Sequence, residues 1–290
     1  MDLSWLEDFA ALAETGNFSR AAEARHCTQP AFSRRIRALE DWVGATLFDR
    51  QSSPVRLTAA GERFRPDATE AWRRLAQARD AAREAAGLAE SQLVVAATHA
   101  LSLLFFPGWL TRLEAEGPLG PVRLVSDSLR GCEEVMVQGD AQFLLAHAHP
   151  AAPSRLDGAG FTAATIGQDL LVPVAAPTAL PDLDDSVAQL AYSPDSGMGR
   201  ILAAELRQRP PLALKPVFTS HLSVVLRTMA RDGRGVAWLP LSLVADDLAI
   251  GALVRLGEGR WDIPVDILLY RPRARQSPTA EAFWARAGRC

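Results

Sequence analysis

From residue 92 to the C-terminus, short apolar segments alternate with segments of helical spacing, and few folds accommodate this alternation. Short apolar runs bounded by turn residues predict buried strands, whereas longer segments with apolar residues every three or four positions predict amphipathic helices. Strands that alternate with helices are typical of a parallel sheet with crossover helices. This part of the chain is therefore predicted to belong to the α/β class.

Two such α/β sets follow one another along the chain. The first has predicted strands at 93–97, 122–126 and 143–147, with helices at 102–116 and 128–139. The second has strands at 170–175, 189–193, 216–219 and 235–239 with helices at 198–208, 222–232 and 241–250, before a last strand at 265–270 and a helix at 279–288. Two sets in tandem predict two lobes with a cleft between them, where ligands bind beyond the carboxyl ends of the strands.

The first 90 residues have helical spacing instead. We predict helices over about 3–15, 19–26 and 29–43, with caps at Ser19 and Thr28 and an end at Gly44, and then a short hairpin within 46–57. Thr58 can cap a fourth helix over about 59–89, although Pro66 should kink this helix or delay its start.

The fourth helix carries apolar residues at alternating spacings of four and three positions. These residues are Phe64, Ala68, Ala71, Leu75, Ala78, Ala82 and Ala85. A heptad seam on a single long helix needs a partner helix to bury it. The chain is therefore predicted to form a homodimer through this helix.

The overall composition excludes several classes of protein. Hydrophobic residues make up 48% of the 290 residues and the net charge is −3, so the chain can bury a core and its global charge indicates neither a nucleic-acid binder nor a membrane-surface protein. No apolar run approaches the roughly 18 residues that span a bilayer, and the acidic start lacks the features of a signal peptide. Cys27, Cys132 and Cys290 have the spacing of neither a disulfide framework nor a zinc site. These features predict a cytoplasmic protein.

Charge becomes informative locally. Residues 19–37 contain five arginines and one acid, Glu23, so their net charge is +5 − 1 = +4. On the helix after Thr28, an apolar stripe leaves an opposite face that carries Gln29, Ser33, Arg34 and Arg37. Arginine and glutamine make bidentate contacts with base edges, each worth about 1–3 kcal/mol of discrimination. Two short helices with a tight turn and such a face predict a helix-turn-helix DNA reader, although a merely solvated charged face has the same pattern.

Several motifs in this region belong together: residues 17–23 (NFSRAAE), 28–40 (TQPAFSRRIRALE), 47–50 (LFDR) and 57–61 (LTAAG). They resemble the DNA-binding helices, wing and linker start of LysR-type transcriptional regulators, and the resemblance extends over the whole chain. It implies that Gln29, Pro30, Ser33 and Arg34 approach bases and phosphates of a double-stranded DNA operator. It also implies that Arg50 and Arg56 lie on the wing side, although residues 51–54 (QSSP) lack the arginines that many members have there.

The resemblance also implies a division of the chain. Residues 1–58 are expected to form a winged helix-turn-helix DNA-binding domain, residues 59–90 a long dimerising linker helix, and residues 91–290 an effector-binding domain. The effector domain would have two α/β lobes, as in periplasmic binding proteins, with lobe I at about 91–166 and 265–290 and lobe II at about 167–264. The expected fold class is α/β overall, and the expected assembly is a homotetramer.

Three further segments resemble a hypochlorite-responsive branch of the same family: residues 97–103 (ATHALSL), 192–200 (YSPDSGMGR) and 235–240 (GVAWLP). In that branch methionine oxidation is the switch, which implies Met198 as the redox residue. A sulfoxide makes an apolar, flexible side chain polar and can repack a lobe interface. The alternative effector is a small organic anion that binds reversibly between the lobes.

Hydroxyl and imidazole groups follow several predicted strands, where helices begin. Backbone N–H groups and helix dipoles favour an anion at such positions, and convergent hydroxyls suit a small carboxylate or oxyanion. The candidate effector-binding residues, Met198 included, are Thr98, His99, Ser102, Ser128, Ser193, Ser196, Met198, Ser220 and His221. Serine and threonine also serve simply as helix caps, and His99 and His221 can either meet across the cleft or be structural.

Two alternatives concern metal and thiol chemistry. His147 and His149 project from one face of a strand end and could join His99 as metal ligands, but the spacing alone, without a carboxylate or thiolate pair, indicates no metal site. Cys132 lies near a helix start, where a thiolate would be stabilised, so it is either a second candidate redox centre or a small buried hydrophobe.

Enzyme motifs are absent from the sequence, which has no GxSxG elbow, no phosphate-binding loop and no HExxH zinc motif. The adjacent acids Glu133–Glu134 and Asp246–Asp247 lie on predicted helices, so the members of each pair point to different faces and cannot act together. We therefore predict a transcriptional regulator that is not an enzyme and needs no cofactor or metal. The remaining alternative is an adaptor whose N-terminal helices bind another protein.

Overall fold

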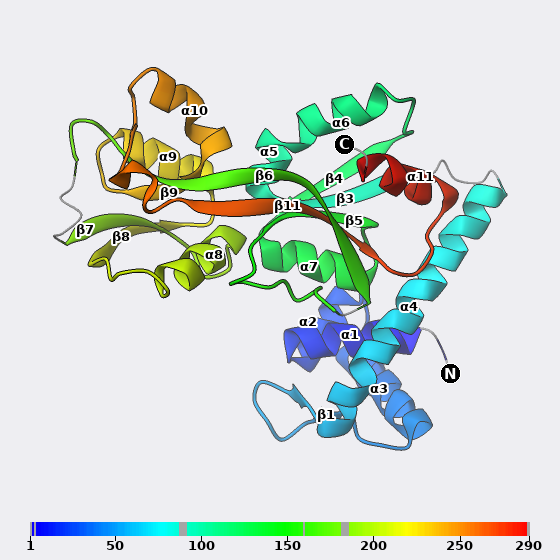
Figure 1. Cartoon of the computed structure of the whole chain (residues 1–290). Helices are drawn as coiled ribbons and strands as arrows, with labels where there is room; N and C mark the ends of the chain where they lie inside the picture. Colours follow the sequence, from blue (N-terminus) through cyan, green and yellow to red (C-terminus); the bar gives the residue numbers. More distant parts are fainter. Residues whose placement is uncertain (1, 3, 87–91, 159, 181–185, 289–290) are drawn as a thin grey trace. The chain divides into compact units, whose positions relative to one another are not determined.

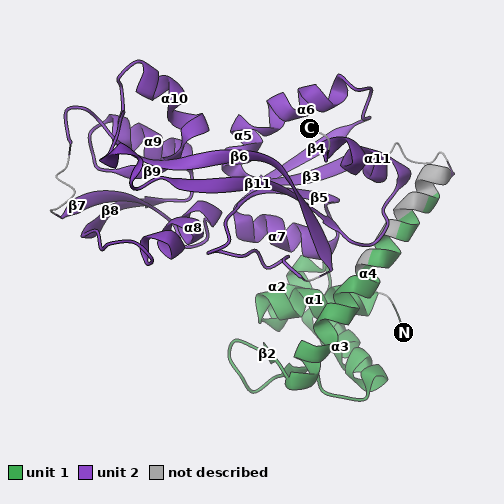
Figure 2. Cartoon of the chain, in the orientation of Figure 1, with its two compact units in different colours: residues 1–85 green, residues 86–290 purple. Residues whose placement is uncertain are grey.

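The computed structural model describes residues 2, 4–86, 92–158, 160–180 and 186–288, and in helix α4 it leaves the side chains of residues 73, 77, 80, 81 and 83–85 undescribed. The chain forms two compact units, residues 1–85 and 86–290 (Figure 1 and Figure 2). Each unit has its own hydrophobic core. Within the ranges described, none of the helices combines the length and the apolar character needed to cross a membrane.

Unit 1 packs helices and a hairpin around one core. Its elements are α1 (Ser4–Thr15), α2 (Phe18–Ala24), α3 (Gln29–Val43), β1 (Phe48–Asp49), β2 (Arg56–Leu57) and α4 (Ala59–Ala85), which continues through Pro66. The apolar stripe of α3 is buried as predicted, by Phe32, Ile36 and Leu39. α2 and α3 with their short turn make a helix-turn-helix, and the antiparallel β1–β2 hairpin makes a wing.

The cap of α2 differs from the prediction. Asn17 stands at the N-cap, and its Oδ1 accepts the backbone N–H groups of Ser19 at 2.9 Å and Arg20 at 3.1 Å. The assignment of the cap to Ser19 was wrong because asparagine is as strong a cap as serine and occurs first in the chain. Gly44 ends α3 in the left-handed conformation, with φ 76°, and Thr58 Oγ1 accepts a backbone N–H in the first turn of α4 at 3.1 Å, both as predicted.

The first two residues of the predicted heptad seam on α4 pack inside unit 1. Phe64 and Ala68 pack in the core of this unit, where the rings of Phe64 and Phe9 meet edge to face with centroids 5.3 Å apart. Ala68 is buried and Phe64 half-buried there, so these two positions contribute to the core of their own unit, and the dimer contact of the seam stays a prediction. The seam residues Ala71, Leu75, Ala78 and Ala82 are exposed, Leu75 by 40%.

Unit 2 is a mixed α/β unit (Figure 1). Its strands are β3 (Leu93–Thr98), β4 (Val122–Asp127), β5 (Phe143–Ala148), β6 (Phe161–Ala175), β7 (Val187–Tyr192), β8 (Leu214–Ser220), β9 (Ala237–Pro240), β10 (Val254–Arg255) and β11 (Ile263–Pro272). Its helices are α5 (His99–Leu104), α6 (Phe106–Glu114), α7 (Leu129–Gln138), α8 (Gly197–Leu206), α9 (Ser223–Arg231), α10 (Leu241–Ala249), the 3-10 turn η1 (Gly257–Gly259) and α11 (Pro278–Ala287). The main sheet has the order β10-β6-β11-β5-β3-β4 with β9 also on β6, and β7 pairs with β8.

The predicted parallel pairing holds for only part of these sheets. β3 runs parallel to β4 and β5, and β7 runs parallel to β8. β6 and β11 are instead antiparallel to each other and to their other neighbours. β6 is also longer than the strand predicted at 170–175. The prediction missed its first part because residues 161–169 (FTAATIGQD) are mostly small or polar and contain no apolar run.

β6 and β11 connect the two lobes of unit 2. Their ladder extends from the Phe161–Pro272 pair to the Leu171–Ile263 pair. Along this ladder β11 also pairs with β5, and β6 also pairs with β9 and β10. Lobe I is thus the part around β3, β4 and β5, and lobe II the part around β7, β8, β9 and β10.

The helix predicted over 102–116 consists of two helices, α5 and α6. Pro107 has no N–H for a continuous helix and occupies the first turn of α6, where that loss costs nothing. Phe105, between the two helices, lies against β6 at Gly167. A Cβ on Gly167 would lie 3.1 Å from the Phe105 ring, so glycine permits this close approach.

Candidate DNA-binding face and effector pocket

α3 presents one polar face to solvent, opposite the stripe that it buries. Gln29, Pro30, Arg34 and Arg37 are exposed and Ser33 is half-buried. Residues at these spacings lie on the same side of a helix. The structure therefore brings together the side chains of α3 that were predicted to contact DNA.

Two arginines of the basic segment are paired with acids. Asp8 on α1 is fully buried, and its carboxylate accepts bonds from Arg25 at 2.9 Å and from Arg35 at 3.3 Å. Arg25 also pairs with Glu7. A buried carboxylate needs such cationic partners, so the local charge of +4 overstates the positive charge that this surface can offer to DNA.

The two arginines of the wing are held differently. Arg50 lies 2.6 Å from Glu40 Oε2 and over the ring of Phe18, 5.4 Å from its centroid. Glu40 Oε1 also accepts the N–H of Leu47 at 2.9 Å, so it ties α3 to the hairpin. Arg56 on β2 is exposed. Arg50 is therefore oriented by its own unit, and its charge is partly offset there.

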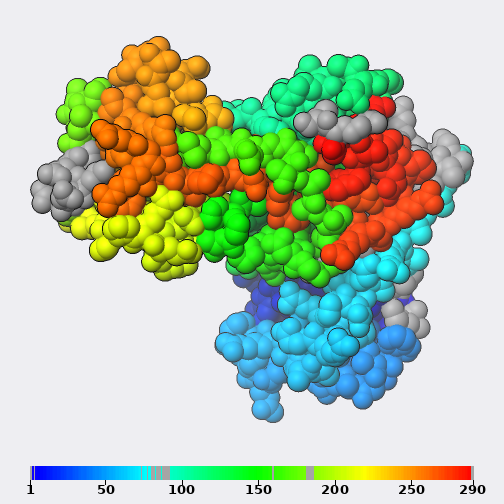
Figure 3. Space-filling view, viewed as in Figure 1, coloured from blue at the N-terminus to red at the C-terminus, as the bar shows by residue number. Residues whose placement is uncertain are grey.

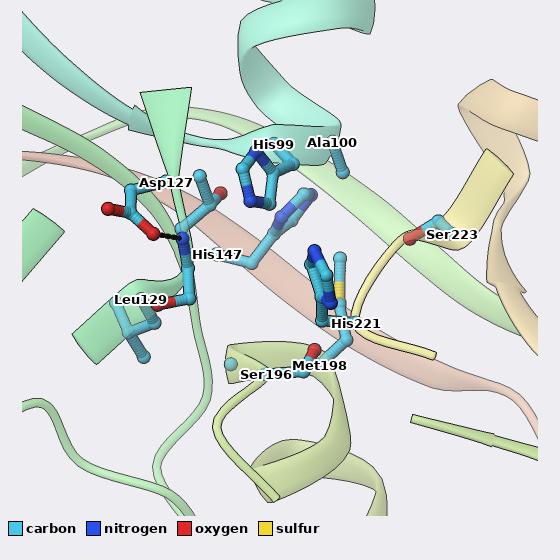
Figure 4. A pocket seen from close by; sticks show the side chains of 12 residues that line it. His99, Ala100, Asp127, Leu129, His147, Ser196, Met198, His221 and Ser223 are labelled. Carbon is cyan, nitrogen blue, oxygen red and sulfur yellow. Dashed lines mark hydrogen bonds between the residues drawn. The ribbon is translucent and has the colours of Figure 1, made fainter. Parts of the chain in front are cut away.

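A cavity of about 30 Å³ lies between the lobes of unit 2 (Figure 4). It is lined by Thr98, His99, Ala100, Asp127, Ser128, Leu129, His147, Ser196, Gly197, Met198, His221 and Ser223. The residues of lobe I follow the carboxyl ends of strands, which is where open α/β sheets bind ligands. The rings of His99 and His221 meet here with centroids 5.4 Å apart, so of the two alternatives for these histidines the contact across the cleft is the one observed.

Helices α7, α8 and α9 begin at this cavity. Ser128 caps α7 and Ser196 caps α8: their Oγ atoms accept the N–H groups of Gly131 at 3.2 Å and of Gly199 at 3.4 Å. These two serines therefore act as helix caps as well as lining the cavity. α9 begins without a side-chain cap. Converging helix N-termini favour a negative or hydrogen-bond-accepting group in the cavity, whereas the Asp127 carboxylate in its wall opposes a negative one.

The predicted effector-binding residues divide into two groups. Those that line the cavity are Thr98, His99, Ser128, Ser196, Met198 and His221. The others lie beside it and bond within the protein. Ser102 Oγ is 2.7 Å from Ser126 Oγ, Ser220 Oγ accepts the N–H of Leu222 at 3.1 Å, and the N–H of Ser193 donates to the Ser220 carbonyl at 3.0 Å.

Sequence reasoning missed several residues that line the cavity. Asp127 directly follows the predicted strand at 122–126, and His147 ends the predicted strand at 143–147, so the position of each already indicated the cleft. Ser223 lies in the first turn of the helix predicted at 222–232. Leu129 and Gly197 carry no polar side-chain group, and no chemical signal could have singled them out.

His147 is a buried, neutral histidine in the cavity wall. Its side chain is 4% exposed, and burial lowers its pKa to about 4, a shift that the Asp169 carboxylate 4.0 Å away only partly opposes. His147 Nε2 and Thr98 Oγ1 are buried without a hydrogen-bond partner. Buried polar atoms are normally hydrogen-bonded, so these two are available to a bound molecule.

Of the three histidines that the sequence offered as metal ligands, His99 and His147 line the cavity and His149 is not among its lining residues. His149 Nδ1 accepts the N–H of Ala151 at 3.2 Å and lies 3.6 Å from Glu205 Oε1, whereas His99 Nδ1 lies 3.1 Å from Ser126 Oγ. Over the part of the chain that the structure describes, no three His, Cys, Asp or Glu side chains are grouped to hold a metal ion.

Cys132 does not have the environment of a redox centre. It is fully buried, and burial raises the pKa of its thiol to about 12, so the reactive thiolate is suppressed despite the nearby helix start. The structure supports the alternative of a small buried hydrophobe. The neighbouring acids point apart as predicted: Glu133 bonds Ser154 in the interior, and Glu134 pairs with Arg130 at 3.0 Å on the surface.

A helix-turn-helix unit followed by a mixed α/β unit defines a DNA-binding transcriptional regulator. Residues 3–62 match the bacterial regulatory helix-turn-helix protein, lysR family, and residues 86–289 match the LysR substrate binding domain. The chain belongs to the LysR family of transcriptional regulators. It is 31% identical over 289 residues to the HTH-type transcriptional regulator YjiE of Escherichia coli (strain K12), a match that covers 98% of this chain and 93% of that protein.

Solved structures of relatives agree over the whole length of the chain. HypT from Salmonella typhimurium, described as a hypochlorite-specific LysR-type transcriptional regulator, is 30% identical with a TM-score of 0.59 and covers 99% of this chain and 98% of its own. The bromide-bound regulatory domain of that protein is 26% identical with a TM-score of 0.58, over 68% of this chain and 93% of its own. Vibrio fischeri DarR, solved in complex with DNA, is 31% identical with a TM-score of 0.57, and the match covers 100% of this chain and 99% of DarR. The fold class expected from the sequence is confirmed, and these relatives are regulators rather than enzymes.

Proposed function

We propose that this LysR-family regulator reads an operator with α3 and responds to hypochlorite, or a related oxidant, through oxidation of Met198. The placement of Met198 carries the proposal. It is the second residue of α8, it is 5% exposed, and it forms part of the cavity wall beside His221 (Figure 4). An oxidant that enters the cavity therefore meets the thioether directly.

The size of the cavity favours a very small reactant. A volume of about 30 Å³ accommodates about two water molecules, since each needs about 10–15 Å³. Hypochlorous acid, with two heavy atoms, fits this space.

The reaction is a two-electron oxidation of sulfur. Hypochlorous acid and the thioether give the sulfoxide, chloride and a proton, so the sulfur gains one oxygen atom and the chlorine is reduced. Met198 packs in the core of lobe II with Ile201 and Leu202. A polar sulfoxide is costly in that core, so oxidation changes the relative stability of the lobe arrangements and thereby passes on the signal.

We assign the chain to the HypT-like branch on two grounds. Two of the three motifs, at 97–103 and 192–200, belong to the cavity wall, since they contain Thr98, His99 and Met198. The similarity to HypT itself extends over nearly the whole chain.

A reversibly bound small anion is the second candidate effector. The helix N-termini around the cavity favour it, and the regulatory domain of the relative HypT has been solved with bromide bound. The two hypotheses predict different protein masses after exposure to the effector, because only oxidation adds an atom to Met198 permanently.

The DNA-binding role is assigned to residues 1–58, the linker to 59–90 and the effector role to 91–290. The operator would be read by Gln29, Pro30, Ser33, Arg34 and Arg37, and Arg50 and Arg56 would contact phosphates.

The exposed stripe of α4 would form the homodimer, and two dimers would form a homotetramer. The complex of the relative DarR with DNA supports this reading over a protein adaptor, and a salt-dependent footprint would distinguish them.

The test is a footprint on the DNA upstream of the protein's own gene, with reduced protein and with protein treated briefly with limiting hypochlorite. Peptide mass is recorded in parallel. We expect an altered footprint together with a gain of about 16 Da, one oxygen atom, on Met198. A footprint that does not change while Met198 is oxidised would refute the oxidant reading. A footprint that bromide or acetate shifts without any change in mass would favour the reversible anion.

A further inference from the structure

Residues 149–155, named here the strap, lie between the helices that begin at the cavity. The strap leaves β5 two residues after His147, which is part of the cavity wall. In the space-filling view the green surface that contains it adjoins the yellow-green surface of α8 (Figure 3). The strap belongs to lobe I in sequence but contacts both lobes.

Contacts at His149, Ala152 and Pro153 attach the strap to lobe II. Arg200 on α8 donates to the carbonyl oxygen of Pro153 at 2.6 Å. Glu205, later on the same helix, lies 3.6 Å from His149. Ala152 packs against the hydrophobic core of lobe II. The strap therefore joins lobe II through a charged donor on α8 and an apolar contact, and the Glu205 carboxylate lies beside His149.

The other end of the strap is anchored in lobe I by a buried acid. Glu133 on α7 accepts the hydroxyl of Ser154 at 2.7 Å and the N–H of Arg155 at 3.0 Å. The N–H of Ser154 in turn donates to Asp157 at 2.8 Å. A buried carboxylate is costly without donors, so Glu133 fixes the position of this end of the strap.

Each attachment lies close to a residue of the cavity wall. On α7, Glu133 is one helical turn beyond Leu129, and on α8, Arg200 follows Met198 by two residues. The two helix starts also touch, since a Cβ on Gly197 would lie 3.0 Å from Leu129. A shift in the first turn of α8 must therefore move the partners of the strap as well.

We propose that the strap is a latch that holds the lobes in the arrangement observed here and is released when α8 moves. Arg200 and Glu205 hold the latch on lobe II, and Glu133 holds it on lobe I. The trigger for release, oxidation or ligand binding at Met198, rests on the proposed function. The latch itself consists of contacts that are present in the unoxidised protein.

The test uses the full-length protein with Arg200→Ala and, separately, Glu205→Gln. Arg207→Ala is the matched control, because Arg207 is an exposed arginine at the end of the same helix. Hydrogen exchange is measured for the strap amides, and the operator footprint is recorded without any oxidant. We expect about tenfold faster exchange in the strap of Arg200→Ala, the change that loss of one charged hydrogen bond produces, and a smaller increase in Glu205→Gln, which alters only a contact at 3.6 Å. We also expect their footprint to match that of oxidised wild-type protein.

Strap exchange and a footprint that equal those of Arg207→Ala would overturn the latch. Faster exchange with an unaltered footprint would overturn it too, because the contacts would then exist without controlling the DNA-binding unit. Glu205→Gln preserves the size and helix propensity of the side chain. Strap exchange and the footprint can therefore still be measured on this variant if Arg200→Ala fails to fold. Both variants are studied without oxidant, so their outcome is independent of whether Met198 is the oxidised residue.

Discussion

The imidazole rings of His99 and His221 face each other with centroids 5.4 Å apart and planes inclined by 46°. His99 begins α5 in lobe I, and His221 lies just before α9 in lobe II. The contact therefore depends on the arrangement of the lobes. The His221 ring also lies beside Met198, where the proposed chemistry takes place (Figure 4).

Replacing Met198 by leucine should remove the response to oxidant while keeping the fold. Leucine has a similar volume and cannot be oxidised, so we expect a stable protein whose footprint hypochlorite no longer changes. Met229→Leu, at a half-buried position on α9 in the same lobe, should retain the response. A Met198→Leu protein that still responds would refute the assignment.

The effector unit should lose stability as the pH falls from about 6.5 to about 4. The folded pKa of His147, about 4, lies below the ordinary value of 6.5, so in this window the unfolded state binds more protons than the folded state. The free energy of unfolding therefore rises with pH. Protonation of His147 in the unfolded state makes this free energy about 2 kcal/mol lower at pH 5 than at pH 7. Urea unfolding followed by hydrogen exchange in β5 measures this loss. In His147→Gln the loss should be smaller by about that amount, and an equal loss in both proteins would contradict the prediction.

Arg34 and Arg56 should contribute to DNA binding in different ways. Arg34→Ala is expected to reduce the preference for the operator over unrelated DNA by about 1–3 kcal/mol, because a bidentate contact with a base is lost. Arg56→Ala should weaken binding to all sequences alike and reduce the salt dependence by about one counterion, as for a phosphate contact. Fluorescence anisotropy with both DNAs at several salt concentrations separates the two effects. An unchanged operator preference in Arg34→Ala would exclude base reading by this residue.

Arg25→Ala should destabilise unit 1 by about 2 kcal/mol. The change leaves the buried Asp8 carboxylate with Arg35 alone, at the longer distance of 3.3 Å. Arg20→Ala, at an exposed position of the same helix, should change the stability by less than about 0.5 kcal/mol. Thermal unfolding followed by hydrogen exchange in α1 provides the comparison, and equal stabilities of the two variants would disprove the role of the Asp8 cluster.

Leu75→Asp should shift the protein toward the monomer. Leu75 is the largest residue in the exposed stripe of α4, and a carboxylate there opposes burial against a second helix. Leu75→Ala should remain dimeric, because it keeps the stripe apolar. Sedimentation velocity at micromolar concentration measures both, and a dimer of unaltered stability in Leu75→Asp would show that the interface lies elsewhere.

Local features of the fold could be predicted from the sequence because their causes are local. The stripe of α3, the glycine stop at Gly44 and the caps at Ser128 and Ser196 each depend on residues a few positions apart. The cap of α2 was assigned wrongly only because two capping residues, Asn17 and Ser19, compete within one turn. The cavity residues were partly predictable for the same reason, since strand ends and helix starts are visible in the sequence.

Long-range features could not be predicted in this way. An apolar run such as 265–270 shows that a strand exists but not its direction, so the antiparallel placement of β11 was missed. The acidic partner of Arg25 and Arg35 lies on another helix, and only the folded unit shows that both arginines form ion pairs with Asp8. The first half of β6 has only two large apolar residues, Phe161 and Ile166, which reach the core from isolated positions and form no apolar run.

The pair of strands that runs through both lobes determines the kind of motion open to them. β6 and β11 are hydrogen-bonded along their length, with one irregularity between Ile267 and Leu268. Stretching such a ribbon breaks backbone hydrogen bonds, whereas twisting it is easy, and a bulge makes the twist easier still. The irregularity lies where β11 also pairs with β5, within lobe I, whereas the stretch of the ribbon toward lobe II is regular. Such a ribbon opposes separation of the lobes along its length more than it opposes a twist of one lobe against the other.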